Sequence, residues 1–246
     1  MLVKTAHINL LEEAIVSLSA GTADPSYPLG RLYDRNVGRD FRATAAATIE
    51  VKVDQGAAGA QAIDRLIIPP GHNLEGMTLD IKHSSDDAVY TPATAQWQGA
   101  EGLIEKSWAP VVKRFWKFII TAPTTVPSLA ELFLTSTYEW EKNPTRPYGP
   151  FEDVHNTQNP QTSGGRDRFL VLGPPKRHRP YEVARAGESQ KDEMEALYGT
   201  YIKGRPFWLC DNSGDWIYGK LQGGLDLTEV AYQRYRYSFD FIEVIP

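Results

Sequence analysis

Histidines and paired carboxylates are the side chains whose types are suited to metal binding or acid–base catalysis. The five histidines are spread along the chain, at His7, His72, His83, His155 and His178. None of their spacings matches the close spacing along one helix that metal sites use. His72 and His83 flank two expected strands and could approach each other, but no cysteine or carboxylate pattern completes a site around them. The spacing therefore predicts no metal ligands.

Two carboxylate pairs have the composition of an acid–base pair for glycoside cleavage, namely Asp86 with Asp87 and Glu139 with Glu141. The first pair follows a strand in a polar turn and the second alternates with aromatic residues, so both are predicted to be solvated. The sequence has no Gly-x-Ser-x-Gly elbow, phosphate-binding glycine loop or dinucleotide fingerprint. We therefore predict no catalytic residue, no cofactor and no enzyme, with a glycan-cleaving enzyme as the rival that these carboxylates leave open.

The composition indicates a folded, β-rich chain. It has 246 residues, 41% of them hydrophobic, with 20 glycines and 17 prolines, which favours short strands joined by tight turns. The formal charge of −5 argues against nucleic-acid specificity, which depends on basic surface. Cys210 is the single cysteine, so it is predicted to be a core residue. Neither a signal peptide nor a membrane insertion segment is expected, because charged residues interrupt every apolar run.

Alternating side chains predict strands through most of the chain. Residues 48–54 place Ile49, Val51 and Val53 on one face. Similar patterns predict further strands at 63–69, 77–83, 111–123 and 128–140, and then at 168–173, 205–210, 215–221 and 235–244. One helix is expected at 188–204, with Ser189 as its N-cap. The predicted fold class is mainly β: an N-terminal jelly-roll β-sandwich and a C-terminal small antiparallel β-sheet domain with one helix.

A proline- and asparagine-rich stretch predicts the domain boundary. The strand patterns stop there, so we expect a domain at 1–143, a linker or arm at 144–165, and a second domain at 166–246. The segment after the linker is basic and contains prolines and an aromatic residue. Such a run is often only a solvated face, but it is also typical of a strap that docks on a neighbouring subunit. The subunit-interface candidates are Arg166, Arg168, Lys176, Arg177, Arg179, Tyr181 and Arg185.

Residues 8–140 resemble the galactose-binding-like, or discoidin-like, jelly-roll domain. The resemblance lies in "INLLEEAIVSLSAG", "YPLGRLYDRNVGRDFRA", "IEVKV" and "IDRLIIPPGHNLEGMTLDIKHSSDD", followed by "RFWKFIITAP" and "LAELFLTSTYEW". It implies a corner built from Leu32, Tyr33, Asp34, Asn36, Phe41 and Arg42, with Phe41 at a position where the family more often has tryptophan.

The same resemblance implies roles for loop residues. Asp34 or Asn36 would cap turn amides, and His72 and Asn73 would satisfy backbone groups at a bend. Family members that bind glycans or lipids use variable loops at one end of the sandwich. This implies glycan-loop candidates at Tyr27, Arg35, Arg39, Trp97 and Gln98.

Residues 166–246 are similar in layout to the ring-forming domains of tailed-bacteriophage tail tips and baseplates, including distal-tail-like proteins. This resemblance implies a virion structural protein that assembles as a trimeric or hexameric ring around the tail channel with other tail proteins, made in the host cytoplasm and located in the virion tail. The order of domains, with the jelly roll first, departs from the usual distal-tail layout. The alternative is a carbohydrate-binding adhesion module that recognises a host surface glycan.

Overall fold

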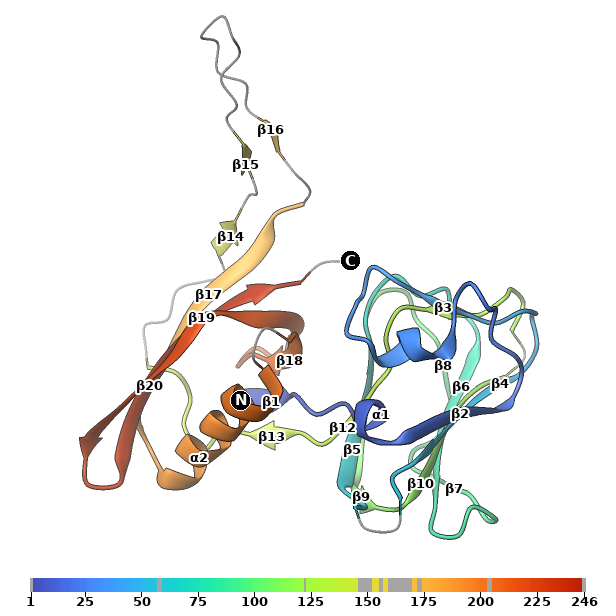
Figure 1. Cartoon of the computed structure of the whole chain (residues 1–246), viewed down its shortest axis with the longest axis horizontal. Coiled ribbons are helices and arrows are strands. Elements are labelled where there is room, and N and C mark those ends of the chain that lie inside the picture. Colours follow the sequence, from blue (N-terminus) through green and yellow to red (C-terminus); the bar gives the residue numbers. More distant parts are fainter. Residues whose placement is uncertain are drawn as a thin grey trace, which may run out of the picture. The chain divides into compact units, whose positions relative to one another are not determined.

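The chain folds into two compact units, which the computed structural model describes over residues 2–56, 59–121, 123–145, 152–154, 157–158, 170–171, 174–202 and 205–244. Unit 1 comprises Met1–Thr5 together with Glu139–Ile245, and unit 2 comprises Ala6–Tyr138 (Figure 1). Strands dominate the described residues, which confirms the mainly β class. Unit 2 is inserted into the sequence of unit 1 directly after its first strand. The observed division therefore differs from the predicted boundaries 1–143, 144–165 and 166–246.

Unit 2 is a β-sandwich. One sheet has the strand order β2-β4-β10-β6-β7, and β8 also pairs with β6. Opposite it lie a three-stranded sheet of order β12-β5-β9 and the pair β11-β3. The bounds of the first sheet are β2 Ile15–Ala20, β4 Ile49–Asp54, β6 Thr78–Ser84, β7 Thr91–Pro92, β8 Trp97–Gln98 and β10 Phe115–Thr121. The others are β3 Phe41–Arg42, β5 Ala62–Ile68, β9 Ile104–Val112, β11 Ser128–Leu129 and β12 Phe133–Thr135, with α1 at Leu10–Glu13 and the 3₁₀ helix η1 at Leu29–Tyr33.

The central strand β10 sets the register of the larger sheet. It pairs antiparallel with both β4 and β6, and Phe118 lies opposite Val51 on one side and Ile81 on the other. All three side chains are buried in the core between the sheets. The predicted alternation at 48–54 is confirmed, because Ile49, Val51 and Val53 are buried while their neighbours face outward.

Two predicted strands are each interrupted in the structure. Residues 111–123 contain the end of β9 and all of β10, separated by a turn at Lys113 and Arg114. Residues 128–140 contain β11, β12 and β13 (Tyr138–Glu139). In the first segment apolar residues flank the turn, but Val111 packs against the core whereas Phe115 packs against Lys52 and Arg114. In the second segment Leu129, Leu132 and Leu134 lie in the core on both sides of the break. Periodicity alone therefore did not locate the breaks.

The polar corner residues have the structural roles that the resemblance implied. The Asp34 carboxylate accepts from the Asn36 amide at 2.9 Å, and the Asn36 side-chain oxygen accepts from the Gly38 amide at 3.1 Å. These are short Asx-type bonds that fix the turn after η1.

The His72–Asn73 bend is also held by its side chains. The His72 ring joins the Gly102 carbonyl at 2.7 Å, and its other nitrogen accepts from the Leu74 amide. Asn73 donates to the Val126 carbonyl at 2.8 Å and accepts from the Ser128 amide at 2.8 Å. Both residues therefore satisfy backbone groups. His72 precedes β6 and His83 lies near its far end, so the two histidines lie towards opposite ends of that strand.

A cluster of ionisable groups is buried beneath α1. Asn9 donates to Glu131 at 3.2 Å, and the Arg35 guanidinium bonds Glu12 and the His7 carbonyl. Burial, with the nearby Asp34 and Glu12 carboxylates, raises the pKa of Glu131 well above its ordinary range. Burial and the Arg35 charge lower the pKa of His7 to about 4. Both shifts favour the neutral form of the side chain inside the fold.

Unit 1 is a seven-stranded antiparallel sheet with one longer helix. Its strand order is β13-β1-β18-β19-β20-β17-β14, with a separate short pair β15-β16. The bounds are β1 Lys4–Ala6, β13 Tyr138–Glu139, β14 Glu152–Val154, β15 Thr157–Gln158, β16 Leu170–Val171, β17 Lys176–Ala186, β18 Phe207–Cys210, β19 Trp216–Ala231 and β20 Arg234–Glu243. The helix α2 runs Glu188–Ala196 and continues as the π-helix η2, Leu197–Ile202. Most of the predicted linker at 144–165 lies outside the described residues.

Aromatic side chains form the core of unit 1. The Trp140 ring makes edge contacts with Tyr181, Tyr237 and Phe239, with ring centroids about 6 Å apart. The predicted alternation in the last strand is confirmed, since Tyr237, Phe239 and Phe241 are all buried. Cys210 is buried, as predicted.

The helix α2 begins at the predicted residue, Glu188, but its N-cap differs from the prediction. Its N-cap is Gly187, which makes no side-chain cap bond, rather than Ser189. The buried Gln190 connects the helix to the sheet by donating to the Tyr237 hydroxyl at 2.5 Å.

The buried Glu131 predicts how stability depends on pH. Its folded pKa is raised, so its contribution to stability is complete below the unfolded pKa of about 4.3 and is lost as pH rises through the folded value. The Glu131→Gln variant has a neutral side chain at every pH. We expect its free energy of unfolding, measured by urea denaturation, to equal that of the wild type near pH 4.5 and to exceed it increasingly at pH 6 and pH 8.

The variant Glu13→Gln, at an exposed position at the end of the adjacent helix α1, is the matched control and should show no such trend. Protonation of His7 contributes to the pH dependence of all three proteins, so it cancels when their free energies of unfolding are compared. A difference between Glu131→Gln and wild type that stays constant with pH would contradict the burial of an ionisable carboxyl here.

Candidate ligand-binding site of unit 2

Most of the predicted glycan-loop residues lie at one end of unit 2. Trp97 and Gln98 pair with Leu79 and Thr78, at the start of β6. Tyr27 bonds the Arg42 amide through its carbonyl, and Arg42 pairs with β11 at the same end. Figure 1 shows β3 and β7 at opposite ends of the unit.

The exposure of these side chains differs. Arg39 and Gln98 are exposed. The Tyr27 ring is half-buried, with the Arg42 and Arg31 guanidinium carbons 4.3 Å and 5.1 Å from its centre. The Trp97 ring packs against the core, with the Lys106 ammonium 5.6 Å from its centre. Neither aromatic ring is therefore a freely exposed platform for a sugar.

Arg35 is not the exposed loop residue that we expected. It is 8% exposed, and its guanidinium bonds Glu12 and the His7 carbonyl and lies over the Phe133 ring. Its backbone has a positive φ of 57°. Arg35 therefore stabilises the fold and is withdrawn as a glycan contact.

A pocket of about 200 Å³ lies at the other end of unit 2. We call it the β6–β7 pocket; it is lined by His83, Ser84, Ser85, Asp86, Val89, Thr91 and Lys113. Its residues come from the end of β6, the loop to β7 and the turn between β9 and β10. Register brings these segments together, because Phe115, which follows the turn, lies opposite Ser84 in β6.

The loop from β6 to β7 is held by its own carboxylates. One Asp86 oxygen accepts from the Ser84 hydroxyl at 2.9 Å and from the Ala88 and Val89 amides at 3.0 Å and 3.2 Å. These donors lower the pKa of Asp86 below its ordinary value, with the Ala88 amide as the largest cause. These bonds within the loop brace it without contacts to the core.

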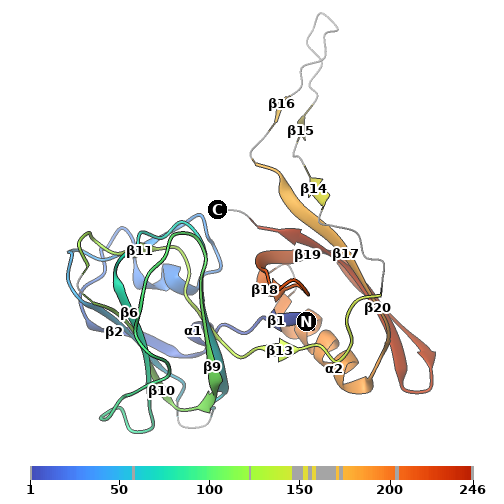
Figure 2. The same cartoon turned by 180° about the vertical axis from the view of Figure 1, so that it is seen from behind.

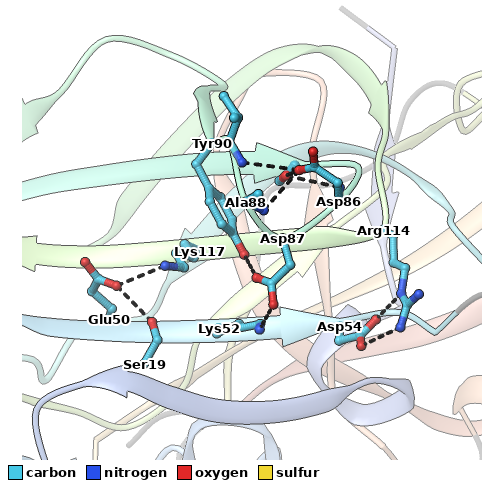
Figure 3. A network of polar contacts seen from close by, with 12 residues as sticks. Ser19, Glu50, Lys52, Asp54, Asp86, Asp87, Ala88, Tyr90, Arg114 and Lys117 are labelled. Carbon is cyan, nitrogen blue, oxygen red and sulfur yellow. Dashed lines mark hydrogen bonds and ion pairs between the residues drawn. The ribbon is translucent and has the colours of Figure 1, made fainter.

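Asp87 anchors the same loop to strand β4 of the same sheet. Its carboxylate pairs with Lys52 of β4 and accepts from the Tyr90 hydroxyl at 2.5 Å, as Figure 3 shows. Lys52, and then Tyr90, lower the pKa of Asp87. Asp87 has a positive φ of 64°, which a non-glycine residue adopts only where surrounding contacts enforce it. Such strained positions cluster at functional sites, which draws attention to this loop.

Two further ion pairs cover the outer face of the sheet beside the loop. Arg114 makes a two-bond pair with Asp54, at 2.7 Å and 2.9 Å, and lowers the pKa of that carboxyl. Lys117 bonds Glu50 at 3.2 Å, and Glu50 also accepts from Ser19 (Figure 3). The cations of this face are thus matched to carboxylates across neighbouring strands.

The floor of the pocket is also fixed. The Lys113 carbonyl accepts from the Gln55 side chain at 2.9 Å and from the buried Trp116 indole at 3.0 Å. His83 makes an edge contact with the Trp116 ring, centroids 5.4 Å apart. Burial, and then the Lys113 charge, lower the pKa of His83, so the imidazole is neutral at pH 7 and offers one donor and one acceptor.

The β6–β7 pocket therefore presents hydroxyl, imidazole, carboxylate and ammonium groups on rigid supports. Within the residues that the structure describes, no group of three or more histidine, cysteine or acidic side chains could hold a metal ion. The arrangement is suited to hydrogen bonding with a small polar ligand. Sequence reasoning missed this site because it weighed Asp86 and Asp87 as an acid–base pair or as solvated residues, not as pocket-lining groups, and placed Lys113 inside a strand. The polar run from Ser84 to Asp87 was the available signal.

The interface candidates of unit 1 have varied surroundings. Arg166 and Arg168 lie outside the described residues. Lys176 and Arg185 are exposed, and Arg177 makes several bonds to Glu243. The expected strap is in fact strand β17, which pairs with β20 along its length.

Two of these candidates are core residues. Tyr181 is 1% exposed, and Arg179 is 7% exposed with its guanidinium 3.6 Å from Asp211. Their positions in a strand that faces the aromatic core explain the difference from the prediction, so Arg179 and Tyr181 are withdrawn as interface residues.

Comparisons with solved structures find proteins of similar fold. The chitosan-binding module 1 from the chitosanase/glucanase of Paenibacillus sp. IK-5 is 14% identical, with 53% of this chain and 100% of that chain covered and a TM-score of 0.45. The CBM32-1 module from a family 31 glycoside hydrolase of Clostridium perfringens is 14% identical, with 53% and 99% covered and a TM-score of 0.43. A Ruminococcus gnavus GH29 fucosidase in complex with fucose is 17% identical, with 53% and 27% covered and a TM-score of 0.46.

No protein-family model matches the chain, and no curated protein matches it in sequence. Among the helices that the structure describes, none combines the length and the apolar character needed to cross a bilayer.

The bonds around Asp86 predict the effect of removing its carboxylate. In Asp86→Ala the Ala88 and Val89 amides lose their acceptor, so their hydrogen exchange should become at least about tenfold faster. The melting temperature should change little, because the loop is exposed. Asp24→Ala, which removes a similar cap from the Ser26 amide at the other end of the unit, is the control. Unchanged exchange at Ala88 and Val89 would show that Asp86 does not organise the loop.

Proposed function

We propose that unit 2 is a carbohydrate-binding module that recognises a glycan through the β6–β7 pocket, without cleaving it. The observation that carries the proposal is a polar pocket whose walls are fixed by hydrogen bonds and ion pairs before any ligand is present. Preorganised polar groups give affinity because little conformational entropy is lost on binding.

The size of the pocket supports a ligand as small as one sugar residue. Its volume of about 200 Å³ is below the range of about 300–1,000 Å³ that holds a drug-sized molecule. It has space for about seven waters at about 30 Å³ each, and a sugar ring with its hydroxyls replaces a water cluster of that order.

The chemistry of the walls supports the same ligand. Ser85 and Thr91 supply hydroxyls that both donate and accept, and neutral His83 supplies one donor and one acceptor. The exposed Val89, with 73% of its surface accessible, supplies an apolar edge beside these groups. A sugar presents the same alternation of hydroxyls and apolar C–H faces.

Glycan binding by the full-length chain tests this proposal. We expect saturable binding to at least one glycan on an array, and we expect the double variant Ser85→Ala/Thr91→Val to weaken that binding at least about tenfold, because two neutral hydrogen bonds of about 1 kcal/mol each are lost.

Arg39→Gln, at the opposite end of unit 2, is the control and should bind as the wild type does. The proposed site would be wrong if Arg39→Gln abolished binding while the double variant retained it. An array without any bound glycan would contradict the carbohydrate-binding function itself.

A second candidate function is favoured by unit 1. The β19–β20 hairpin is a long ribbon in both views (Figures 1 and 2). Pairing of β20 with β17 ends at Tyr235, and the hairpin continues to a tip where Tyr232 is 86% exposed and Val230 is 48% exposed. On its other side β19 pairs with β18 only from Trp216 to Gly219. Exposed aromatic residues and open strand edges are features through which chains associate.

These features support a structural component of a phage tail tip or baseplate, in which unit 1 oligomerises around the tail channel and unit 2 is displayed on it. In this proposal the protein is part of the virion tail and contacts other tail proteins, and three or six copies form the ring. Since unit 1 begins with β1, the sheet domain has both the first and last strands of the chain. In this proposal the jelly roll precedes most of the sheet domain because unit 2 is inserted after the first strand of unit 1.

Sedimentation velocity over a range of concentrations tests the assembly. We expect the wild type to form an oligomer and Tyr232→Ser to raise its dissociation constant at least about tenfold, since a buried aromatic anchor contributes about 2 kcal/mol to an interface. The variant Val89→Ser, at another exposed apolar residue, in unit 2, should assemble normally. A wild-type chain that stays monomeric at every concentration would contradict this second function.

A further inference from the structure

One cation beside the β6–β7 pocket bonds a neutral group, whereas its neighbours at this end of unit 2 bond carboxylates. Lys52 pairs with Asp87, Arg114 with Asp54 and Lys117 with Glu50. Lys113 also lies here, yet its ammonium bonds the neutral Ser85 hydroxyl, at 2.9 Å. Among the residues that the structure describes, no carboxylate forms an ion pair with Lys113.

The Asp86 carboxylate, which lines the pocket, bonds donors of its own loop. One oxygen of Asp86 accepts three hydrogen bonds, from the Ser84 hydroxyl and the Ala88 and Val89 amides. Its negative charge is therefore stabilised by the donors of its own loop. An ammonium has three donors, and Lys113 uses one of them on Ser85.

The position of Lys113 is set by the backbone. Its carbonyl is held by the Gln55 side chain and the Trp116 indole, so the turn that presents the ammonium cannot shift without breaking both bonds. The side chain is half-buried at the pocket wall. A cation placed in this way attracts an anion more strongly than a fully solvated lysine does.

We propose that the β6–β7 pocket selects a sugar that carries a carboxylate, with the Lys113 ammonium binding the carboxylate and Ser85, Thr91 and His83 binding the hydroxyls. This inference rests on the carbohydrate-binding function proposed above and names its ligand class. Hydrogen bonds between a charged donor and a charged acceptor are about twice as strong as neutral ones, which gives the site a preference of about tenfold for an acidic sugar over its neutral counterpart.

Calorimetric titration of the full-length chain with D-galacturonate, D-galactose and acetate tests the preference. We expect galacturonate to bind about tenfold more tightly than galactose, and the preference to shrink as salt is raised from 0.05 M to about 0.5 M. Acetate should bind more weakly than either sugar, because it lacks the hydroxyls.

Variants at one position separate the contributions. Lys113→Gln should lose the preference for galacturonate over galactose, while its affinity for galactose stays within about twofold of the wild type. Lys113→Arg should keep the preference for galacturonate. Arg39→Gln removes the same charge from the opposite end of unit 2 and should leave every affinity unchanged. Circular dichroism confirms that each variant is folded.

Three results would overturn the inference in different ways. Equal affinity for the two sugars, unaffected by Lys113→Gln, would remove the acidic preference and leave the carbohydrate-binding function standing. Acetate binding as tightly as galacturonate would identify a simple carboxylate site. Binding of neither sugar would contradict the inference together with the function on which it rests.

Discussion

The pairing of β10 with β4 and β6 determines where the polar groups of unit 2 lie. Phe115 lies opposite Asp54 on one side and Ser84 on the other. This register places the β9–β10 turn, the end of β4 and the β6–β7 loop at one end of the sheet. A slip of one residue would bury the outward charges of β4 and expose Val51 and Val53. The hydrophobic core thus specifies the register, and the register positions the pocket.

Electrostatic matching turns this arrangement into a rigid surface. Each cross-strand ion pair is partly exposed and contributes little to stability by itself. Together they connect β4, β10 and the β6–β7 loop, and Asp87 stays in a left-handed conformation that it would not choose alone. The stability of unit 2 comes from its apolar core, whereas the ion pairs determine the shape of one loop.

Local patterns were sufficient to predict strands whose side chains alternate strictly. Ile49, Val51 and Val53, and the aromatic residues of the last strand, were assigned to the core correctly for this reason. The roles of Asp34, Asn36, His72 and Asn73 were predicted from the resemblance to the galactose-binding-like domain. The bonds of Asp34 and Asn36 are local, whereas His72 and Asn73 also bond residues 30 to 55 positions away. The turn at Lys113 and Arg114 was missed because its flanking residues, Val111 and Phe115, continue the apolar run.

Long-range contacts were not predictable from one sequence. Arg35 has the type and loop position of a ligand contact, and only the fold shows that Glu12 and the His7 carbonyl hold it inside. Arg179 and Tyr181 lie in a basic, proline-containing segment, yet β20 makes that segment an inner strand. The pairing of β1 with β18 links the first residues to the last third of the chain, which is why the insertion of unit 2 was predicted as a terminal domain.

Mapping of sugar-induced amide shifts on the full-length chain tests the central claim most directly. In a two-dimensional ¹H–¹⁵N spectrum titrated with D-galactose and D-galacturonate, we expect the changes to concentrate at residues 83–91 and at Lys113. Changes concentrated at Tyr27, Arg39 and Gln98, or absent with both sugars, would contradict a sugar site in the β6–β7 pocket.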